Sequence, residues 1–403
     1  MGRFVVGMFA GVMLLASVPA GHAAEITVES PSSSTLGREP PTLRLTGALR
    51  QGDAAAMRRL LVRLKAERTG LGTGLGTGLG TGLGTGPLAT VELSSLGGDL
   101  NEGLELGYLF RDFNVATVVR RRDICLSACA LAFLGGTAKR EGTERTAAHG
   151  IEVGARLGFH TFYLNTQSAD APTADDPERS RRQGFREAQA ATAALVRYAA
   201  DLGIDPKFVA TMMARPPEEL TYVATTEDFL TLNVCPMGSA RPAVSLAEQA
   251  LNVCNHATGW HDPAEIDQVR MLPSQQARRI MLENIQQNMQ SLKVKGALSD
   301  QLASWSVMRV ERSIDNLYDD LRAAGVRLPE IVGPVFEVRG YRQGGREMQC
   351  FVSLSVDDAD RYDVAIRRPG KWSHPDRSAP RDCRGLFLHD RDATINPRPV
   401  AAR

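Results

Sequence analysis

The sequence has almost no net charge, because 47 Lys and Arg residues oppose 46 Asp and Glu residues over 403 positions. A formal charge of +1 gives no electrostatic basis for binding nucleic acid or an anionic membrane surface. After the first residues, no run is apolar enough to span a membrane, which takes about 20 residues. The balance of 43% hydrophobic and 23% charged residues is typical of a soluble globular protein, and the length allows two or three domains.

The sequence also lacks a phosphate-binding or metal-binding pattern. Tandem GLGT units fill residues 69–87, but no Lys follows them and their spacing matches no nucleotide motif, so we interpret them as a flexible surface loop. The stretch "CNHATGWH" around Cys254 has ligand-type residues, yet a zinc site needs three or four that converge. The histidines of the second half are scattered and are interpreted as ordinary surface or satisfied groups: His256, His261, His374 and His389. We therefore expect no metal and no organic cofactor.

The first 24 residues are typical of an export signal. A basic start at Arg3, an apolar run from Phe4 to Ala16 and small residues before Glu25 match the regions of a secretory signal peptide. The chain is therefore expected to be periplasmic or secreted. An uncleaved membrane anchor is the alternative, and membrane contact is expected only in that case. The polar, Pro/Ser-rich residues 25–41 would then form a mobile leader.

Six cysteines in an exported chain predict disulfides, which are rare in the cytosol. Six cysteines allow 15 connectivities, so the sequence does not fix the pairing. Pairing of neighbours along the chain is the simplest hypothesis: Cys125–Cys129, Cys235–Cys254 and Cys350–Cys383.

From residue 42 onward, strand and helix patterns alternate. Alternating apolar residues predict strands at 42–46, 88–95, 114–120 and 156–164. Apolar residues at helical spacing predict helices at 54–68, 97–113, 127–136, 185–203 and 206–215. Such alternation implies an α/β layer architecture. The segment 141–156 is expected to be a surface loop between two of these elements.

The alternation of strand and helix patterns ends near residue 240. We place a boundary there between a first domain, 42–240, and a C-terminal α+β region, 241–403. Residues 263–324 predict two amphipathic helices, and residues 335–356 predict a β-hairpin across Gly344 and Gly345. The Pro-, Arg- and Asp-rich tail from residue 368 is expected to be irregular. No chemical constellation is evident in this second half.

Three pieces of the first half carry residue types that acyl transfer requires. "LSSLGGDLNEG" (93–103) ends a strand in Gly-Gly, where backbone N–H groups are free to donate. Ser127 begins a small-residue helix in "DICLSACALAFLGG" (123–136), and His160 lies in the apolar strand "LGFHTF". A serine hydroxyl needs an adjacent base to become a nucleophile, and two converging N–H groups can hold an oxyanion. Such residues also occur together by chance in many proteins, so their spacing alone does not establish a function.

The order of these motifs resembles that of the proteolytic subunit of the Clp protease and its crotonase-fold relatives, over roughly residues 43–235. It is closer still to exported members of that superfamily, in which cysteines flank the serine. The resemblance implies a fold of repeated ββα layers, Ser127 as nucleophile and His160 as general base. It also implies that the N–H groups of Gly98 and Ala128 form the oxyanion hole, that the substrate is a peptide or protein, and that the chain is a homo-oligomer.

The chain departs from the family pattern at two places. Leu96 stands where the family's turn carries proline. The family's acid precedes a stretch resembling "YVATTED" (222–228), and counting back reaches "RPPEEL", where Glu218 is the candidate acid and Glu219 the alternative. Asp201 and Asp205 come too early in the chain.

Without an acid the imidazole would be unoriented and the rate would fall by several orders of magnitude. Two functions therefore stay open: an exported serine hydrolase, acting as a peptidase, and a catalytically inactive binding or scaffolding module of the cell envelope. Thioester chemistry, as in crotonase relatives, ranks last because no carboxylate pair lies at the active turn.

Overall fold

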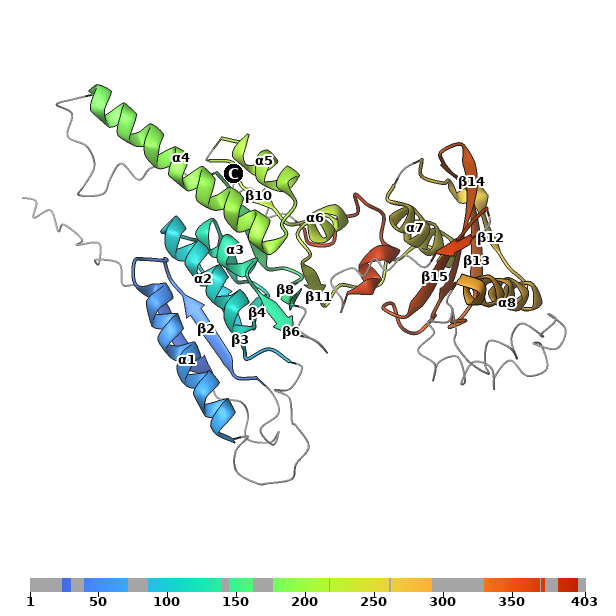
Figure 1. Ribbon diagram of the computed structural model, residues 1–403, viewed down its shortest axis with the longest axis horizontal. Helices are drawn as coiled ribbons and strands as arrows, with labels where there is room; N and C mark the ends of the chain where they lie inside the picture. Colours follow the sequence, from blue (N-terminus) through green and yellow to red (C-terminus); the bar gives the residue numbers. More distant parts are fainter. Residues whose placement is uncertain are drawn as a thin grey trace, which may run out of the picture.

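The computed structural model describes residues 24–29, 40–71, 86–139, 145–161, 177–216, 218–260, 262–291, 330–369, 371–373 and 383–397. Helices and strands alternate in its first part and an antiparallel sheet dominates its second part (Figure 1), so the fold is mixed α/β. Three expected features fall outside the described residues: the export signal up to residue 23, the GLGT repeat over 72–85, and the second amphipathic helix of the C-terminal region.

The first sheet has six strands in the order β1-β2-β3-β4-β8-β11. Their bounds are Glu25–Glu29 (β1), Thr42–Thr46 (β2), Ala89–Ser94 (β3), Val115–Val119 (β4), His149–Glu152 (β8) and Cys235–Met237 (β11). All neighbours are parallel except β1 with β2. Parallel neighbours need long crossover connections, which the alternating helices provide.

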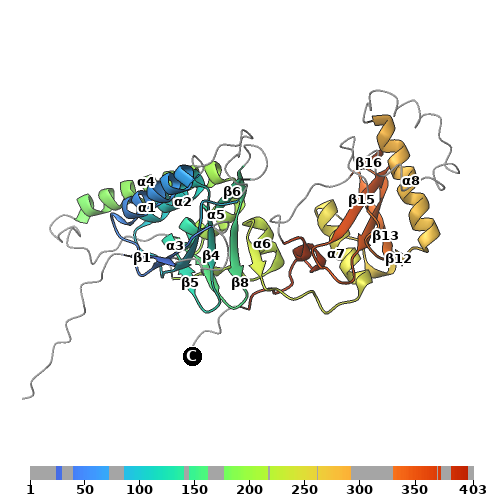
Figure 2. The ribbon, with the colours of Figure 1, turned by 90° about the horizontal axis from the view of Figure 1, so that it is seen from below.

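Helices α1 (Asp53–Leu71) and α2 (Leu100–Phe113) lie along one side of this sheet (Figure 2). Every second strand residue points at them, and these residues, such as Leu43, Leu45 and Val91, are fully buried in the first core. This period of two is the alternation that predicted the strands.

A second sheet has the order β10-β9-β5 and carries the candidate site. Its strands are β5 (Ile124–Leu126), β9 (Arg156–Phe159) and β10 (Thr221–Tyr222), with β9 parallel to β5 and antiparallel to β10. A single bridge from Ser95 to Cys125 joins the end of β3 to β5. The remaining elements of this part are α3 (Ala128–Phe133), α4 (Pro177–Leu202), α5 (Pro206–Met213), α6 (Thr226–Thr231) and the pair β6 (Thr137–Lys139) and β7 (Arg145–Ala147).

Two segments expected to be irregular are strands instead. The expectation of a mobile leader over 25–41 is wrong for residues 25–29, which form β1, because Ile26 packs against the first core while the backbone pairs with β2. The expectation of a surface loop over 141–156 is wrong for residues 149–152. These residues form β8 between β4 and β11, with Ile151 fully buried.

The C-terminal part is built on a five-stranded antiparallel sheet in the order β12-β13-β14-β15-β16. Its strands are Val269–Met271 (β12), Val335–Gln343 (β13), Arg346–Leu354 (β14), Tyr362–Arg368 (β15) and Lys371–Ser373 (β16). The predicted hairpin is β13 and β14, with Gly344 and Gly345 both at positive φ in the turn. Apolar residues of α7 (Leu246–Thr258) and the sheet form a second core.

The first predicted amphipathic helix of this region is shorter than expected. A 3-10 turn, η1 (Ile266–Gln268), and strand β12 occupy its first part, and helix α8 (Ser274–Ser291) begins only after Pro273. Proline has no N–H to donate within a helix, so a helix that included residues before Pro273 would be broken there.

The tail is more ordered than expected. After the 3-10 turn η2 (Arg384–Leu388), residues 389–397, here called the strap, return to the first part of the chain. Asn396 accepts from the Gly154 N–H and donates to the Ala155 carbonyl, and the N–H groups of Ile395 and Asn396 both donate to the Ala224 carbonyl. These long-range hydrogen bonds give an irregular backbone a fixed path.

None of the helices in the described ranges combines the length and the apolar character needed to cross a membrane.

Candidate active site

Ser127 occupies the sharp turn between β5 and α3. Its backbone has φ 56° and ψ −127°, a combination that non-glycine residues rarely adopt. Its N–H donates to the Gly158 carbonyl at 2.9 Å, and its carbonyl accepts from the Leu131 N–H at 3.2 Å. A serine held in a strained strand-to-helix turn is the geometry that exposes a nucleophilic hydroxyl in many hydrolases.

The Ser127 hydroxyl is not used as a helix cap. A serine at the first position of a helix usually accepts a hydrogen bond from a backbone N–H two or three residues later. Here α3 has no side-chain capping bond, whereas Ser245 at the start of α7 accepts from Glu248 in the usual way. Among the described residues, the Ser127 hydroxyl therefore has no structural partner that would explain its presence.

The Gly97–Gly98 turn lies directly against Ser127. A Cβ on Gly97 would sit 2.6 Å from the Ser127 Cβ, and one on Gly98 would sit 2.2 Å from the Leu49 carbonyl oxygen. Both glycines have positive φ, at 102° and 144°. Only glycine fits at either position, because a side chain would be both strained and blocked.

The turn is fixed from its other side by Leu49, which donates to the Gly97 carbonyl at 2.8 Å and accepts from Asp99 at 3.0 Å. Within the described part of the chain, the N–H groups of Gly98 and Ala128 donate to no acceptor. They are the two donors that the family resemblance implied for an oxyanion hole, a role that requires N–H groups without an internal acceptor.

His160 follows β9 immediately, close to Ser127 in register. Leu126 pairs with Gly158, and the Gly158 carbonyl accepts the Ser127 N–H. His160 is two residues after Gly158 in the chain. Its Nδ1 is 2.5 Å from the Thr161 carbonyl oxygen. A carbonyl can only accept, so the proton must be on Nδ1, and Nε2 carries the lone pair that a general base needs. No hydrogen bond joins Ser127 to His160 in this structure, and unliganded sites are often looser than the reacting complex.

Glu218 lies near the end of strand β9, which His160 follows, but its side chain does not contact His160. Thr221 pairs with Phe159 in the antiparallel β9–β10 ladder, so Leu220 lies opposite His160 and Glu218 comes just beyond the end of β9. The Glu218 side chain is exposed. The position that an acid would occupy at Nδ1 is held by the Thr161 carbonyl instead.

The two earlier acids have other partners. Asp201 accepts a 2.8 Å hydrogen bond from the Tyr108 hydroxyl, and Asp205 caps α5 by accepting from the Lys207 N–H. Neither carboxylate is therefore available to orient His160.

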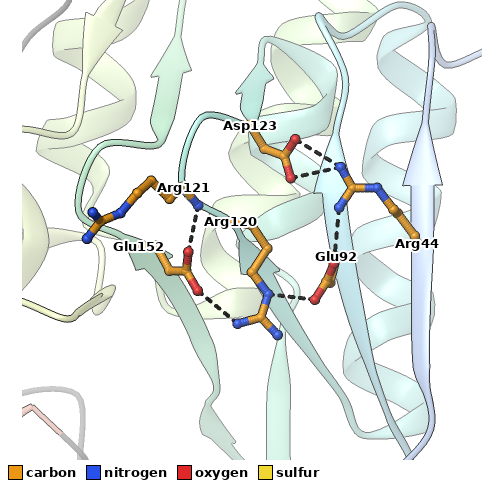
Figure 3. A network of polar contacts seen from close by, with 6 residues as sticks. All are labelled: Arg44, Glu92, Arg120, Arg121, Asp123 and Glu152. Atoms are coloured by element: carbon orange, nitrogen blue, oxygen red, sulfur yellow. Dashed lines mark hydrogen bonds and ion pairs between the residues drawn. The ribbon is translucent and has the colours of Figure 1, made fainter. Parts of the chain in front are cut away.

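A charged network that the sequence reasoning missed holds the approach to β5 (Figure 3). Arg44 on β2 donates through Nη2 to both carboxylate oxygens of Asp123, at 2.9 and 3.0 Å, and through Nη1 to Glu92 on β3. The hydrogen bond with Asp123 raises the pKa of Arg44. Asp123 comes four residues before Ser127, so this pair fixes the start of the strand that ends at the candidate nucleophile.

The network continues across the sheet through Arg120, which bonds Glu92 at 2.5 Å and Glu152 at 2.9 Å (Figure 3). Glu152 also accepts from the Arg121 backbone N–H, and this bond lowers its pKa. The signal in the sequence was a charged residue between buried apolar ones, as in Glu92 between Val91 and Leu93. That pattern indicates that Glu92 lies on the sheet face opposite the helices. It does not indicate which residues of the neighbouring strands pair with it.

The three disulfides do not all follow the expected pairing. Cys125 and Cys129 are joined, with Cα atoms 5.3 Å apart. Pairing of the other four cysteines with their sequence neighbours is wrong, because Cys235 joins Cys383 and Cys254 joins Cys350, at Cα separations of 5.7 and 5.9 Å. Folding brings β14 against α7, and the Cys235–Cys383 bridge joins β11 to the residue before η2, so tertiary structure overrides sequence proximity.

The metal-like stretch around Cys254 has a structural explanation. Its cysteine is in a disulfide, and His256 accepts from Trp260 through Nδ1 and donates to the His389 carbonyl through Nε2, both at 3.0 Å. Burial lowers the pKa of His256 to about 4, so the ring is neutral. In the described ranges no group of three or more His, Cys, Asp or Glu side chains could hold a metal ion. His261 and His374 lie outside these ranges.

No family model matches the chain, and no curated protein matches it. Solved structures that match include ClpP1 from Listeria monocytogenes and a point mutant of the same protein. Each has a TM-score of 0.28 and 12% sequence identity, over 45% of this chain and 81% of the other. Similarity at this level says nothing about catalytic residues.

Proposed function

We propose that this chain is a serine hydrolase that cleaves peptide bonds, with Ser127 as nucleophile and His160 as general base. The observation that supports it is the backbone of Ser127, which has positive φ in a strand-to-helix turn and a hydroxyl that caps no helix. Strained backbone of this kind persists where the surroundings impose it, and it clusters at active sites.

In the proposed reaction, the Ser127 Oγ attacks the scissile carbonyl while His160 Nε2 takes its proton. The carbonyl oxygen becomes an oxyanion that the N–H groups of Gly98 and Ala128 stabilise. His160 then gives the proton to the leaving amine, which departs and leaves an acyl-enzyme. Water, deprotonated by the same imidazole, releases the acid and restores Ser127.

The orientation of His160 is proposed to come from two sources. The Thr161 carbonyl holds the Nδ1 proton in the unliganded chain. Glu218 is the proposed carboxylate, and its approach to Nδ1 would require movement of its exposed loop. Glu218→Gln therefore separates the two: an unchanged labelling rate assigns the orienting role to the carbonyl, and a large loss assigns it to the carboxylate.

We further propose that residues 42–240 form the catalytic unit and residues 241–403 an accessory region. Three disulfides favour an oxidising compartment, in keeping with export of the chain. On the basis of the family resemblance, we also propose that the chain self-associates and that its substrate is a peptide or protein. The proposed reaction uses neither a metal nor an organic cofactor.

Labelling with a fluorophosphonate tests the proposal, because this probe reacts with activated serines. We expect wild type to be labelled, Ser127→Ala to lose all labelling and His160→Ala to lose most of it. Ser239→Ala, which removes an exposed serine outside the site, is the matched control and should label like wild type. Folded wild-type protein that resists the probe would instead support the inactive binding or scaffolding module.

A further inference from the structure

Cys125 and Cys129 flank Ser127 two residues away on either side. Both are fully buried in the first core, so their bridge lies beneath the turn. Their Cα atoms are 5.3 Å apart, whereas five extended residues would separate them by about 13 Å. The bridge therefore cannot close over an extended chain; here strand β5 ends at Leu126 and helix α3 begins at Ala128, so the bridge spans the turn at Ser127.

Other supports of the turn are few. Helix α3 has only six residues and no side-chain capping bond at its start. The Ser127 backbone is held by two hydrogen bonds, one to Gly158 and one from Leu131. A residue in a sparsely populated backbone conformation keeps it only when its surroundings over-determine it. The disulfide is the covalent part of those surroundings.

We infer that the Cys125–Cys129 disulfide is a positioning element that holds Ser127 in its nucleophilic conformation, so that the chain without this bridge reacts 10- to 30-fold more slowly. This inference rests on the proposed function. In the chain-entropy model, closing a loop of five residues in a freely flexible chain is worth about 30-fold, which sets the upper limit of the effect of the bridge on this turn. A chain made in a reducing compartment would thus reach its full reactivity only after oxidation.

The oxidation needs a disulfide-donating partner of the thiol oxidoreductase class. The thiolate of one cysteine attacks the partner's disulfide and forms a mixed disulfide, releasing one partner thiolate. The second cysteine thiolate then attacks the mixed disulfide, closes the Cys125–Cys129 bond and displaces the other partner thiolate. The two protons lost by the cysteines balance the two taken up by the partner, which leaves as a dithiol with both electrons.

The test compares two double variants, because a fully buried bridge resists reductants in the folded chain. Cys125→Ala with Cys129→Ala removes the bridge beneath Ser127, and Cys254→Ala with Cys350→Ala removes a bridge in the second core. The maximal rate of fluorophosphonate labelling and the probe concentration at half that rate are measured for each, alongside thermal unfolding. Cys125→Val with Cys129→Ala, which refills part of the lost volume, serves if the first variant does not fold.

We expect the first variant to lose 10- to 30-fold in maximal labelling rate with an unchanged half-saturating probe concentration. The second variant should keep the wild-type rate even if its unfolding temperature falls. A wild-type rate in the first variant, or equal losses in both, would overturn the positioning role while leaving the hydrolase intact. Wild-type protein that is not labelled at all would overturn both proposals, and that result is distinct from the other two.

Discussion

Replacing Ser127 by glycine should stabilise the protein while it removes the proposed nucleophile. Ser127 has φ 56° and ψ −127°, a conformation that glycine adopts without the steric cost a Cβ imposes. Most substitutions that remove a functional group also remove favourable contacts and destabilise the fold. A gain in stability at this position would therefore report strain that the fold maintains for the sake of the hydroxyl.

The size of the gain follows from two opposing effects. A non-glycine residue in such a conformation costs about 1–3 kcal/mol. Glycine is freer in the unfolded chain, which costs about 0.5–1 kcal/mol on folding. Ser127→Gly should therefore be about 1 kcal/mol more stable than Ser127→Ala, which also lacks the hydroxyl but keeps the Cβ. In a domain of 150–250 residues this corresponds to about 2–4 °C in Tm.

Urea and thermal unfolding of the two variants measure the difference. Ala190→Gly, at an exposed position within α4, is the matched control and should lose about 1 kcal/mol, because glycine is a poor helix former. The reasoning is refuted if Ser127→Gly is less stable than Ser127→Ala by an amount like that of the control. In that case the turn would be an ordinary one and the nucleophile hypothesis would lose its main support.

The remaining predictions concern the oxyanion turn, the charged network and a buried histidine. Gly97→Ala should abolish fluorophosphonate labelling of folded protein, because its Cβ would sit 2.6 Å from that of Ser127; normal labelling would show that the turn moves freely. Glu92→Gln should cost about 2 kcal/mol in urea unfolding, since this 9% exposed carboxylate joins Arg44 to Arg120. Glu105→Gln, in a pair whose side chains are half exposed, should cost less than about 0.5 kcal/mol, and equal costs would contradict the argument. His256 has a folded pKa of about 4, below its ordinary 6.5, so the unfolded chain binds the proton at a higher pH than the folded chain does. The free energy of unfolding should therefore fall as the pH is lowered from 6.5 to 4, by up to about 3 kcal/mol. His256→Gln cannot titrate, and a curve of stability against pH as steep as that of wild type would refute the assignment.

Some strands and helices of the first part, such as β2 and α2, could be predicted because they have a clear period or a clear start. Leu43 and Leu45 alternate with polar residues, and α2 begins at a capping Asp99 that follows two glycines. Strand β8 could not, because it has only four residues and its burial comes from neighbours on β4 and β11 that are distant in sequence. Short strands in the middle of a sheet owe their structure to tertiary contacts rather than to local pattern.

The candidate site was predictable in its residue types but not in its geometry. The sequence indicates Ser127, Gly98 and His160, yet the positive φ of Ser127 and its close packing against Gly97 are evident only in the structure. The Thr161 carbonyl at His160 could not be foreseen, since backbone groups leave no mark in a sequence. The long-range disulfides were missed for a related reason: Cys235 and Cys383 are 148 residues apart, and only the tertiary fold brings them together.

The strap also sets the order in which the chain can finish folding. Asn396 bonds the Ala155 carbonyl across 241 residues, so part of the first core is completed by nearly the last residues described. Domains generally fold as units while the chain emerges from its N-terminus. The residues of the C-terminal sheet are all synthesised before the strap, while Leu386 and Ile395, close to the end of the described chain, pack with the first core. The contacts of the first core are therefore complete only after nearly all described residues have been synthesised, and a chain that stops short of residue 383 leaves Cys235 without its partner.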